Sequence, residues 1–431
     1  MTRYLLATWE GGGVLPPELG LARRLIARGH SVHVIADPAA QDAARSVGCT
    51  FSPWVTAPHK YSLDPDEDLL RDWEIKNPLA SFKKALDVFV CGPADRFAAD
   101  TLSALQQHPA DVILADFMIL GAQIAAEAAK LPLGVLMPNI NMRPGKGVPP
   151  VGPGLMPARG PLGAMRDTLI RAVGNRVWAK GVPGLNRARV SVGLTPLPDI
   201  WQQFDRATRV FVMTSPSFDF QPREQQPNLR YVGPILDDPT WAGAMWTPPW
   251  PASNTDPLVL VGLSSTYQQQ QSALQNVIDA LAPLPVRALV TLGPSLPADA
   301  VTSPGPHIAI VQTAPHGLVF PHAAAAITHC GHGTTIRALA AGVPLVCMPM
   351  GRDQNDTAAR VVASGAGVRI KPTAAAAAIR SAVERVLREP SHTTAARGLR
   401  DAIARETAEV DPVALLEELA PQAAPGVSHA S

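Results

Sequence analysis

The sequence predicts an α/β protein made of two doubly wound, Rossmann-like domains that face each other across a cleft. Three observations lead to this prediction. The chain has 431 residues, which exceeds the usual size of one hydrophobic core. Short apolar strands alternate with helical segments in both halves, as in buried parallel sheets. Between the halves, residues 237–257 combine tryptophans with prolines and show no periodicity, which is typical of a linker.

The first half opens with a βαβ unit. An apolar strand over residues 4–8 leads into a glycine loop at residues 10–13. A helix begins near Pro16, because proline is tolerated in the first turn, and its apolar residues recur on one face. Gly29 follows where this helix ends, and residues 31–36 form the second strand.

The same alternation continues along the chain. It predicts a strand over 111–115, a helix over 122–129 and a strand near 133–137. Residues 139–197 are rich in proline and glycine, which is typical of walls and lids over a site. In the second half the predicted strands are residues 258–263, 287–292, 307–311, 324–328 and 344–348.

These elements divide the chain into an N-terminal domain over 1–236, the linker over 237–257 and a C-terminal domain over 258–400. Helices over 401–420 follow, and residues 421–431 form a tail of small and polar residues that we expect to be disordered. Two such domains bind ligands at the carboxyl ends of their strands and in the cleft between them.

The composition argues against nucleic-acid and membrane partners. The net charge is +1, from 37 Lys+Arg and 36 Asp+Glu, and no basic cluster stands out. The apolar N-terminal stretch is too short for a signal peptide, and no apolar run is long enough for stable membrane insertion. Four scattered cysteines favour reduced thiols. We expect a cytoplasmic protein and leave the oligomeric state open, with a homodimer as one option.

The most informative segment is residues 328–335, which read THCGHGTT and join an apolar strand to a helix. Gly331 and Gly333 allow the backbone to approach a ligand closely, and the free N–H groups at a helix N-terminus attract anions. His329 and Thr334 add side-chain donors. The segment predicts a diphosphate site without a metal, since its spacing fits no structural zinc pattern. A glycine turn with a helix cap and no ligand is the alternative.

This segment and those after it resemble the donor-binding signature of family 1 glycosyltransferases, which have the GT-B fold. The matching positions are residues 329–334 (HCGHGT), residues 338–344 (ALAAGVP), Pro349, Asp353 and Gln354. The resemblance implies that the donor phosphates lie against His329, Gly331, Gly333 and Thr334. It also implies that Asp353 and Gln354 bind sugar hydroxyls, for which a helix N-cap is the alternative at Asp353. Ser264 and Ser265 would lie on the other side of the diphosphate.

The resemblance further implies an inverting transfer of a hexose from a UDP- or dTDP-sugar co-substrate to a small lipophilic natural product, with no cofactor and no metal. The N-terminal domain would hold the acceptor and the C-terminal domain the donor. Candidate acceptor-binding residues are Trp73, Phe82, Phe89, Phe117, Met118 and Met142. Most side chains of this kind otherwise belong to the core.

Two departures from the family pattern concern the nucleoside. Thr313 occupies the position of the tryptophan that usually stacks on the donor base, and His316 is a candidate to compensate for it. The family's ribose-binding glutamate falls on Arg337, which accepts no hydrogen bond. The donor base, uracil or thymine, therefore stays open.

A larger departure concerns the catalytic base. Most family members carry a histidine after the first strand, but alignment on Pro17 places Val14 or Gly13 there, and neither accepts a proton. The remaining candidates are Asp116, at the end of a strand, and Glu10, on the glycine loop. A carboxylate desolvated in an apolar pocket has a raised pKa and becomes a competent base. The alternative for Asp116 is a solvated loop residue or a helix cap, and the alternative for Glu10 is a structural role.

Two other functions stay open. An auxiliary protein or pseudoenzyme of the GT-B fold is favoured by the missing histidine and stacking ring, whereas His329 and the Asp353–Gln354 pair argue against it. A nicotinamide-dependent oxidoreductase would use Gly11 and Gly13 as the start of a dinucleotide fingerprint, but proline replaces its third glycine.

Overall fold

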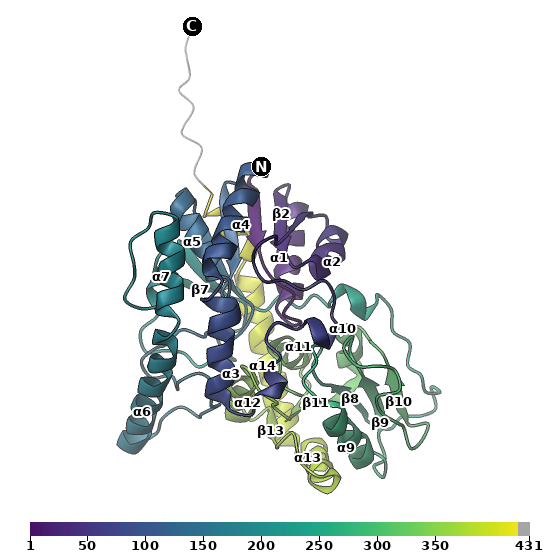
Figure 1. Cartoon of the computed structure of the whole chain (residues 1–431). Coiled ribbons are helices and arrows are strands. Elements are labelled where there is room, and N and C mark those ends of the chain that lie inside the picture. Colours follow the sequence, from purple (N-terminus) through teal and green to yellow (C-terminus); the bar gives the residue numbers. More distant parts are fainter. Residues whose placement is uncertain (421–431) are drawn as a thin grey trace.

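The protein consists of two α/β domains, each built on one parallel sheet (Figure 1). The computed structural model describes residues 1–420, and the predicted tail over 421–431 lies outside them. The first sheet has strand order β3-β2-β1-β4-β5-β6-β7, and the second has order β10-β9-β8-β11-β12-β13. The strand order reverses between β1 and β4 and again between β8 and β11, which is where such sheets bind ligands. The predicted fold class is confirmed.

The first sheet is buried between two layers of helices. Its strands are β1 (Arg3–Ala7), β2 (Ser31–Ala36), β3 (Thr50–Pro53), β4 (Val112–Asp116), β5 (Leu133–Met137), β6 (Arg209–Val212) and β7 (Leu229–Tyr231). Leu5 and Ala7 face one core and Tyr4 and Leu6 the other, since successive side chains alternate across a strand. The first core contains α4 (Ala94–Gln107), α5 (Leu120–Ala129), α7 (Val182–Ser191) and α8 (Trp201–Asp205). The second contains α1 (Leu15–Ala27), α2 (Gln41–Ser46) and α15 (Pro412–Glu417).

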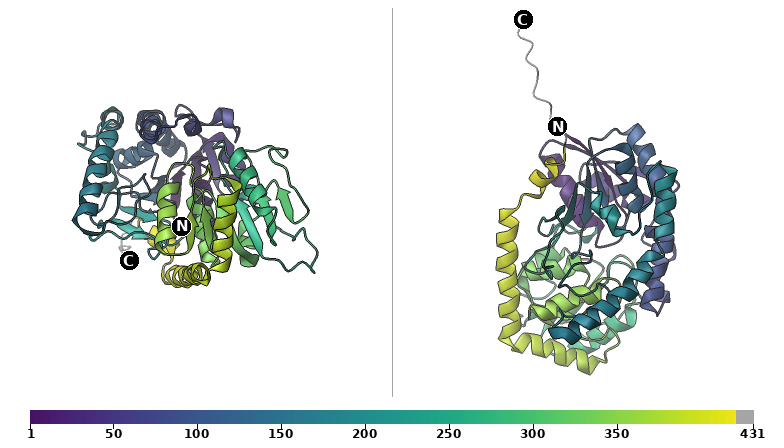
Figure 2. Two further views of the ribbon diagram at one scale, coloured as in Figure 1. Left: turned by 90° about the horizontal axis from the view of Figure 1, so that it is seen from below. Right: turned by 90° about the vertical axis from the view of Figure 1, so that its left-hand side faces the viewer.

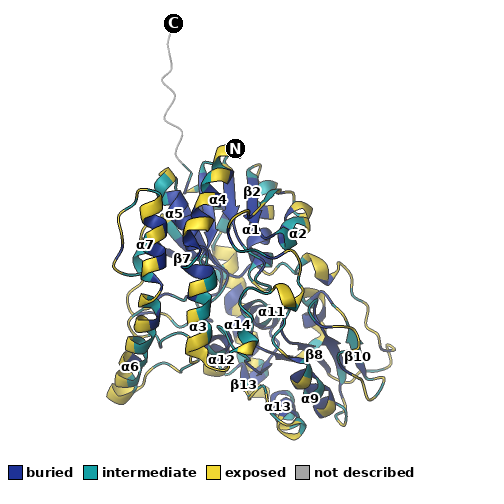
Figure 3. Ribbon diagram, in the orientation of Figure 1, coloured by how far each residue is buried: buried dark blue, intermediate teal, exposed yellow. Residues whose placement is uncertain are grey.

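The second sheet has the same layered design. Its strands are β8 (Leu258–Gly262), β9 (Arg287–Thr291), β10 (Ile308–Val311), β11 (Ala323–Thr328), β12 (Leu345–Cys347) and β13 (Gly367–Arg369). One face packs on α9 (Gln271–Leu281) and α13 (Ala376–Arg388). The other packs on α10 (His316–Val319), α11 (His332–Ala340), α12 (Gln354–Ala363) and α14 (Pro390–Glu409). Figure 3 shows both sheets buried and the outer helix faces exposed.

Two further α-helices, α3 (Pro78–Ala85) and the long α6 (Gly160–Ala179), lie mostly outside these layers. The π-helical turn η4 (Leu86–Val90) follows α3 and packs in the first core through Leu86, Phe89 and Val90. Helices α3 and α6 extend beyond the first sheet toward the level of the second domain (Figure 1). Among residues 1–420, none of the helices is long and apolar enough to cross a membrane.

Sequence analysis missed four strands, β3, β6, β7 and β13. Each has only three or four residues, which is too short to show a period of two. The helix after β11 begins at His332, inside the segment 328–335 that was predicted to lead into it. Gly333 and Thr334 therefore lie in the first helical turn, which brings the anion-attracting end of the helix closer to β11.

The C-terminal helices return the chain to the first domain. Helix α14 runs unbroken from the second domain to the first (Figure 2, right), so the predicted boundary at residue 400 falls inside one helix. Its residue Ala396 packs in the core of the second domain, whereas Glu406 accepts hydrogen bonds from the Ser217 backbone N–H (3.1 Å) and two serine hydroxyls of the first. Helix α15 then adds Leu416 to the core under β1. Residues 401–420 therefore tie the two domains together.

A buried ion pair joins the domains near the cleft. Arg360 Nε, in α12, lies 2.6 Å from Asp219 Oδ1 of the first domain, and their side chains are 4% and 0% exposed. The other carboxylate oxygen of Asp219 accepts from the backbone N–H of Asn141 (2.8 Å) and the hydroxyl of Tyr231 (2.9 Å). Arg360 also lies over the ring of Phe220, 4.3 Å from its centroid. Removing either charge would leave the other buried without compensation.

We expect Asp219→Ala to lower the free energy of unfolding by about 3–5 kcal/mol, because the Arg360 guanidinium is then left unpaired. The measurement is denaturant-induced unfolding followed by circular dichroism. The matched control is Glu384→Ala, which breaks the more exposed pair with Arg388 and should cost less than about 1 kcal/mol. Adding Arg360→Met to Asp219→Ala should recover part of the loss. A loss below about 1 kcal/mol in Asp219→Ala would contradict this account.

Candidate active site

Two loops, one from each domain, meet at the carboxyl ends of β1 and β8. Gly12, on the loop after β1, has a left-handed backbone (φ +72°). A Cβ atom there would lie 2.9 Å from Ser265 Oγ and 2.8 Å from Thr266 Cγ2, on the loop after β8. Only glycine fits both this φ and this close approach. The two domains therefore touch at the point where the sequence predicted the cleft.

Glu10 holds this glycine loop in place. Its Oε1 accepts a hydrogen bond from the Gly12 backbone N–H (2.8 Å), and its own N–H donates to Asp37 Oδ2 (2.7 Å). Burial raises the pKa of Glu10 to about 7, against the nearby charge of Lys60, which lowers it. The carboxyl group is turned onto its own loop, which fits the structural alternative better than the expected base in the cleft.

Asp116 ends β4 and faces a second carboxyl group that sequence analysis missed. Asp116 Oδ1 accepts from the Met118 backbone N–H (2.8 Å), whereas its Oδ2 has no donor partner. Glu18 of α1 is also fully buried; it accepts from the Thr8 hydroxyl and leaves Oε1 without a donor. Burial raises the pKa of Asp116 to about 7, and burial together with the charge of Asp116 raises that of Glu18 well above its ordinary value. The two groups therefore share a proton near neutral pH.

The sequence did carry a signal for Glu18. It lies four and seven residues before Ala22 and Leu25, on the apolar face of the first helix, where an acidic residue is out of place. A buried acidic side chain needs a polar partner, and here that partner is Asp116 at the end of β4.

The predicted phosphate segment is shaped around His329. The imidazole is 8% exposed, and its Nδ1 has no hydrogen-bond partner. A Cβ at position 331 would lie 2.5 Å from His329 Nε2, so glycine is required for the ring to lie there. Cys330, between them, adopts a left-handed backbone (φ +67°). Burial, then the charge of Arg352, lowers the pKa of His329 to about 3, so the ring is neutral and able to donate one N–H.

The first turn of α11 completes this segment and contacts the first domain. Gly331 is the N-cap and Thr334 is half-buried in the first turn. A Cβ at Gly333 would lie 3.9 Å from the Gly13 carbonyl oxygen. His332 Nε2 lies 2.8 Å from the Thr214 hydroxyl of the first domain, so its imidazole serves the interface.

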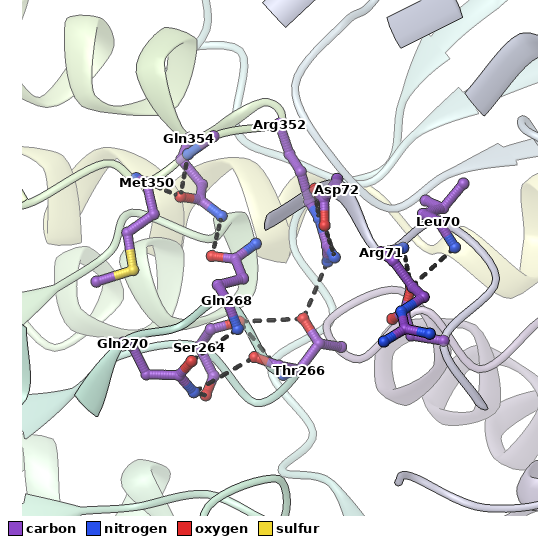
Figure 4. Close-up of polar contacts among 12 residues, drawn as sticks. Leu70, Arg71, Asp72, Ser264, Thr266, Gln268, Gln270, Met350, Arg352 and Gln354 are labelled. Carbon is purple, nitrogen blue, oxygen red and sulfur yellow. Dashed lines mark hydrogen bonds and ion pairs between the residues drawn. The ribbon is translucent and has the colours of Figure 1, made fainter. Parts of the chain in front are cut away.

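Arg352, which the sequence did not single out, is a cation that links the two domains (Figure 4). Its guanidinium binds both carboxylate oxygens of Asp72, at 2.7 and 2.9 Å, and donates to the Thr266 hydroxyl at 2.9 Å. The Thr266 backbone N–H in turn donates to Ser264 Oγ (3.2 Å). A bidentate pair of this kind fixes the segment around Asp72 over the loop after β8. No sequence signal marked Arg352, because its partner lies in an irregular segment of the other domain.

The two predicted sugar-binding residues lie side by side at the start of α12. Gln354 Oε1 accepts from the backbone N–H groups of Met350 (2.7 Å) and Gly351 (3.0 Å), and its Nε2 donates to Gln268 Oε1 (3.0 Å; Figure 4). Asp353 Oδ2 accepts from Asn139 Nδ2 of the first domain (3.0 Å). Asp353 occupies the N-cap position but makes no capping bond, so the capping alternative does not hold.

A small cavity of about 50 Å³ opens beside the serines of the loop after β8. Residues lining it include Asp238, Trp241, Ser264, Ser265, Thr313, His316 and Arg337. His316 Nε2 lies 3.1 Å from the Thr291 hydroxyl, and burial, then the charge of Arg337, lowers the pKa of His316 to about 4. The cavity thus brings together the serine loop, His316 and both positions at which the sequence departs from the family pattern.

The six predicted acceptor-binding residues fall into two groups. Phe89 is 1% exposed and packs in the core against Trp9 and Phe97, with ring centroids 4.5 and 5.5 Å away, so its ring leaves no face for an acceptor. The other five side chains are half-buried: Trp73, Phe82, Phe117, Met118 and Met142. Trp73 contacts Tyr267 across the domain boundary, with ring centroids 5.2 Å apart.

The wall expected between residues 139 and 197 is anchored to α12. The carboxylate of Asp356 accepts from the backbone N–H groups of Gly152 (2.6 Å) and Gly154 (3.0 Å). Over residues 1–420, the structure brings together no group of three or more His, Cys, Asp or Glu side chains able to hold a metal ion.

Known proteins resemble this chain over its whole length. Residues 275–419 match the family described as erythromycin biosynthesis protein CIII-like, C-terminal domain. The chain is 30% identical over 428 residues to 4'-demethylrebeccamycin synthase of Lentzea aerocolonigenes, which covers 97% of this chain and 99% of that protein.

Solved structures show the same fold. The calicheamicin glycosyltransferase CalG4 superposes with a TM-score of 0.75 at 22% identity, over 99% of this chain and all of that one. The glycosyltransferase VinC, solved in complex with dTDP, superposes with a TM-score of 0.69 at 19% identity, over 96% of this chain and 99% of that one. On this evidence the chain belongs to the natural-product glycosyltransferases of the GT-B fold.

Proposed function

We propose that this glycosyltransferase moves a hexose, with inversion, from a UDP- or dTDP-sugar to a small lipophilic natural product. The observation that carries the proposal is the meeting of the glycine loop after β1 with the loop after β8. His329 lies at the end of β11, the strand next to β8, and its Nδ1 has no hydrogen-bond partner. The rebeccamycin relative and the dTDP complex of VinC support this class of donor and acceptor. Membership of the family sets the oxidoreductase alternative aside.

The donor diphosphate would lie between the loop after β8 and the first turn of α11. Neutral His329 donates one N–H, the helix N-terminus supplies partial positive charge, and Ser265 adds a hydroxyl. Arg352 adds a guanidinium nearby, although Asp72 offsets part of its positive charge. These groups stabilise the charge that grows on the diphosphate as it leaves, so that no metal is required. Asp353 and Gln354 would face the sugar.

The acceptor would be deprotonated by Asp116, directly or through a water. Its proton moves to the carboxylate as the acceptor oxygen bonds to the anomeric carbon, and the bond from that carbon to the diphosphate breaks. Glu18 is a positioning residue in this scheme, because it shares a proton with Asp116 and its hydrogen bond offsets part of the rise that burial causes in the pKa of Asp116. Phe117 and Met118, two of the acceptor-binding candidates, follow Asp116 directly in the chain.

His329→Ala should weaken binding of UDP and dTDP by about 10- to 100-fold, because a hydrogen bond to a charged acceptor contributes roughly 1.5–3 kcal/mol. Calorimetric titration with and without magnesium measures this loss, and magnesium should not change it. The control is His307→Ala, whose ring bonds the Ala282 carbonyl at the far edge of the sheet. Equal affinities in wild type and His329→Ala would exclude His329 from the phosphate site.

Asp116→Asn should lower kcat by about 10²- to 10⁴-fold, as expected for loss of a general base, with nucleotide binding retained. The measurement is release of the nucleoside diphosphate with an acceptor found by screening lipophilic aglycones. Asp111→Asn, just before the opposite end of the same strand, is the matched control and should keep its activity. Turnover of Asp116→Asn within a few-fold of wild type would rule Asp116 out as the base.

The shared proton also predicts a pH-dependent stability. The pKa values of Asp116 and Glu18 are raised in the folded chain. The folded chain therefore keeps protons on these groups that the unfolded chain releases above about pH 4. Their contribution to stability is present below that pH and is lost as pH rises through the raised pKa values, of which that of Asp116 is about 7. Relative to wild type, Glu18→Gln should therefore raise the thermal midpoint more at pH 8 than at pH 5. Glu389→Gln, at an exposed site, is the control, and an equal shift at both pH values would refute the shared proton.

A further inference from the structure

The linker forms one wall of the small cavity beside Ser264 and Ser265. Asp238 and Trp241, from the linker, line the same space as Thr313 and Arg337, from the second domain. The cavity adjoins the serines that would bind the diphosphate. A group attached to the phosphates would therefore lie in or beside this cavity. Under the proposed function, that group is a nucleoside.

Trp241 supplies the aromatic surface that Thr313 lacks. It lies in the short turn Thr240–Ala242 and is 38% exposed, so part of its indole is open to solvent beside the cavity. An aromatic ring at the edge of a polar pocket provides a face on which a base can stack, and such stacking tolerates different bases. Thr313 offers a hydroxyl and a methyl group only.

Asp238 supplies the acceptor that Arg337 lacks. Its Oδ2 accepts from the Gly317 backbone N–H (3.0 Å), whereas its Oδ1 lies 3.6 Å from Arg337 Nε, beyond hydrogen-bond distance. Arg337 donates to the carbonyl oxygens of Leu236 and Asp237. Asp238 Oδ1 can therefore accept a hydrogen bond from a hydroxyl group. The positive charge of the neighbouring Arg337 guanidinium holds the carboxylate in place.

We propose that Trp241 stacks on the base of the donor nucleotide and that Asp238 accepts a hydrogen bond from its pentose. This assignment rests on the proposed function and adds the interdomain linker to the donor site. It gives the two departures at the nucleoside site, Thr313 and Arg337, the same explanation, because the start of the linker supplies both missing groups.

Nucleoside entry requires this wall to move. A cavity of about 50 Å³ holds one or two waters and is too small for a nucleoside. The linker turn is the part of the cavity lining that can move most easily, because it has only three residues and Trp241 is partly exposed. Thr313 and Arg337, by contrast, belong to the packed second domain. Binding therefore shifts Trp241 and changes its fluorescence.

The test compares full-length wild type with Trp241→Ala, Trp241→Phe and Asp238→Asn in titrations with UDP, dTDP and inorganic pyrophosphate. Trp241→Ala should weaken binding of a nucleoside diphosphate by about 5- to 100-fold, from a stacking contribution of about 1–3 kcal/mol per base. It should leave pyrophosphate binding within twofold. Trp241→Phe should restore most of the affinity. Asp238→Asn should weaken nucleotide binding several-fold without affecting pyrophosphate.

The matched control is Trp246→Ala, in the same linker but packed near His322 and outside the cavity lining. It should keep nucleotide affinity and the quenching of tryptophan fluorescence that UDP or dTDP causes in wild type, whereas Trp241→Ala should lose that quenching. Thermal unfolding confirms that each variant is folded.

Each remaining outcome is decisive. Nucleotide affinity within twofold of wild type in Trp241→Ala would overturn this inference and leave the proposed function standing. Equal losses for nucleotide and pyrophosphate would show that the variant disturbs the phosphate site, and would also overturn the assignment. If wild type binds neither UDP nor dTDP, the proposed function falls and the inference falls with it.

Discussion

The geometry of the cleft depends on the buried ion pair between Arg360 and Asp219. A charge pair that is almost fully desolvated tolerates little displacement, because each partner is costly to leave alone. Arg360 lies in α12, whose first residues carry Asp353 and Gln354 toward the cleft. The ion pair therefore fixes the helix that presents the sugar-binding candidates relative to the first domain. Asn139 repeats this coupling at the cleft itself, through its bond to Asp353.

Desolvation sets the protonation states in the site, and it acts in opposite directions on acids and bases. Burial raises the pKa of Asp116 and Glu18, so the pair keeps a proton near neutral pH. The same effect lowers the pKa of His329, so its imidazole is neutral. The proposed acceptor side thus has a base of suitable strength without a histidine, and the donor side has a neutral hydrogen-bond donor beside a permanently charged guanidinium.

Three of the segments that join the domains have different roles. Helices α14 and α15 attach the end of the chain to the first domain, through the hydrogen bonds of Glu406 and the packing of Leu416. The segment around Asp72 reaches over the second domain and binds Arg352. The linker is held to α1 through Asp237 and to α10 through Asp238. Because the linker also lines the cavity proposed for the nucleoside, we expect donor binding to affect the arrangement of the domains.

The sequence by itself determined the features that depend on neighbouring residues. Apolar periodicity located most strands, and the glycines of residues 328–335 located the segment that we propose as the phosphate site, because both signals are local. Tertiary structure alone decided which distant groups meet. Glu18 acquires its partner from β4, Arg352 from the segment around Asp72, and Thr313 shares a cavity with Trp241 only because the linker folds back over it. Strands of three or four residues, such as β7 and β13, were likewise decided by pairing with a neighbour. The physical reason is common to all of these: the free energy of a buried charge, a paired strand edge or a cavity wall comes from its partner, and local sequence does not encode where that partner lies.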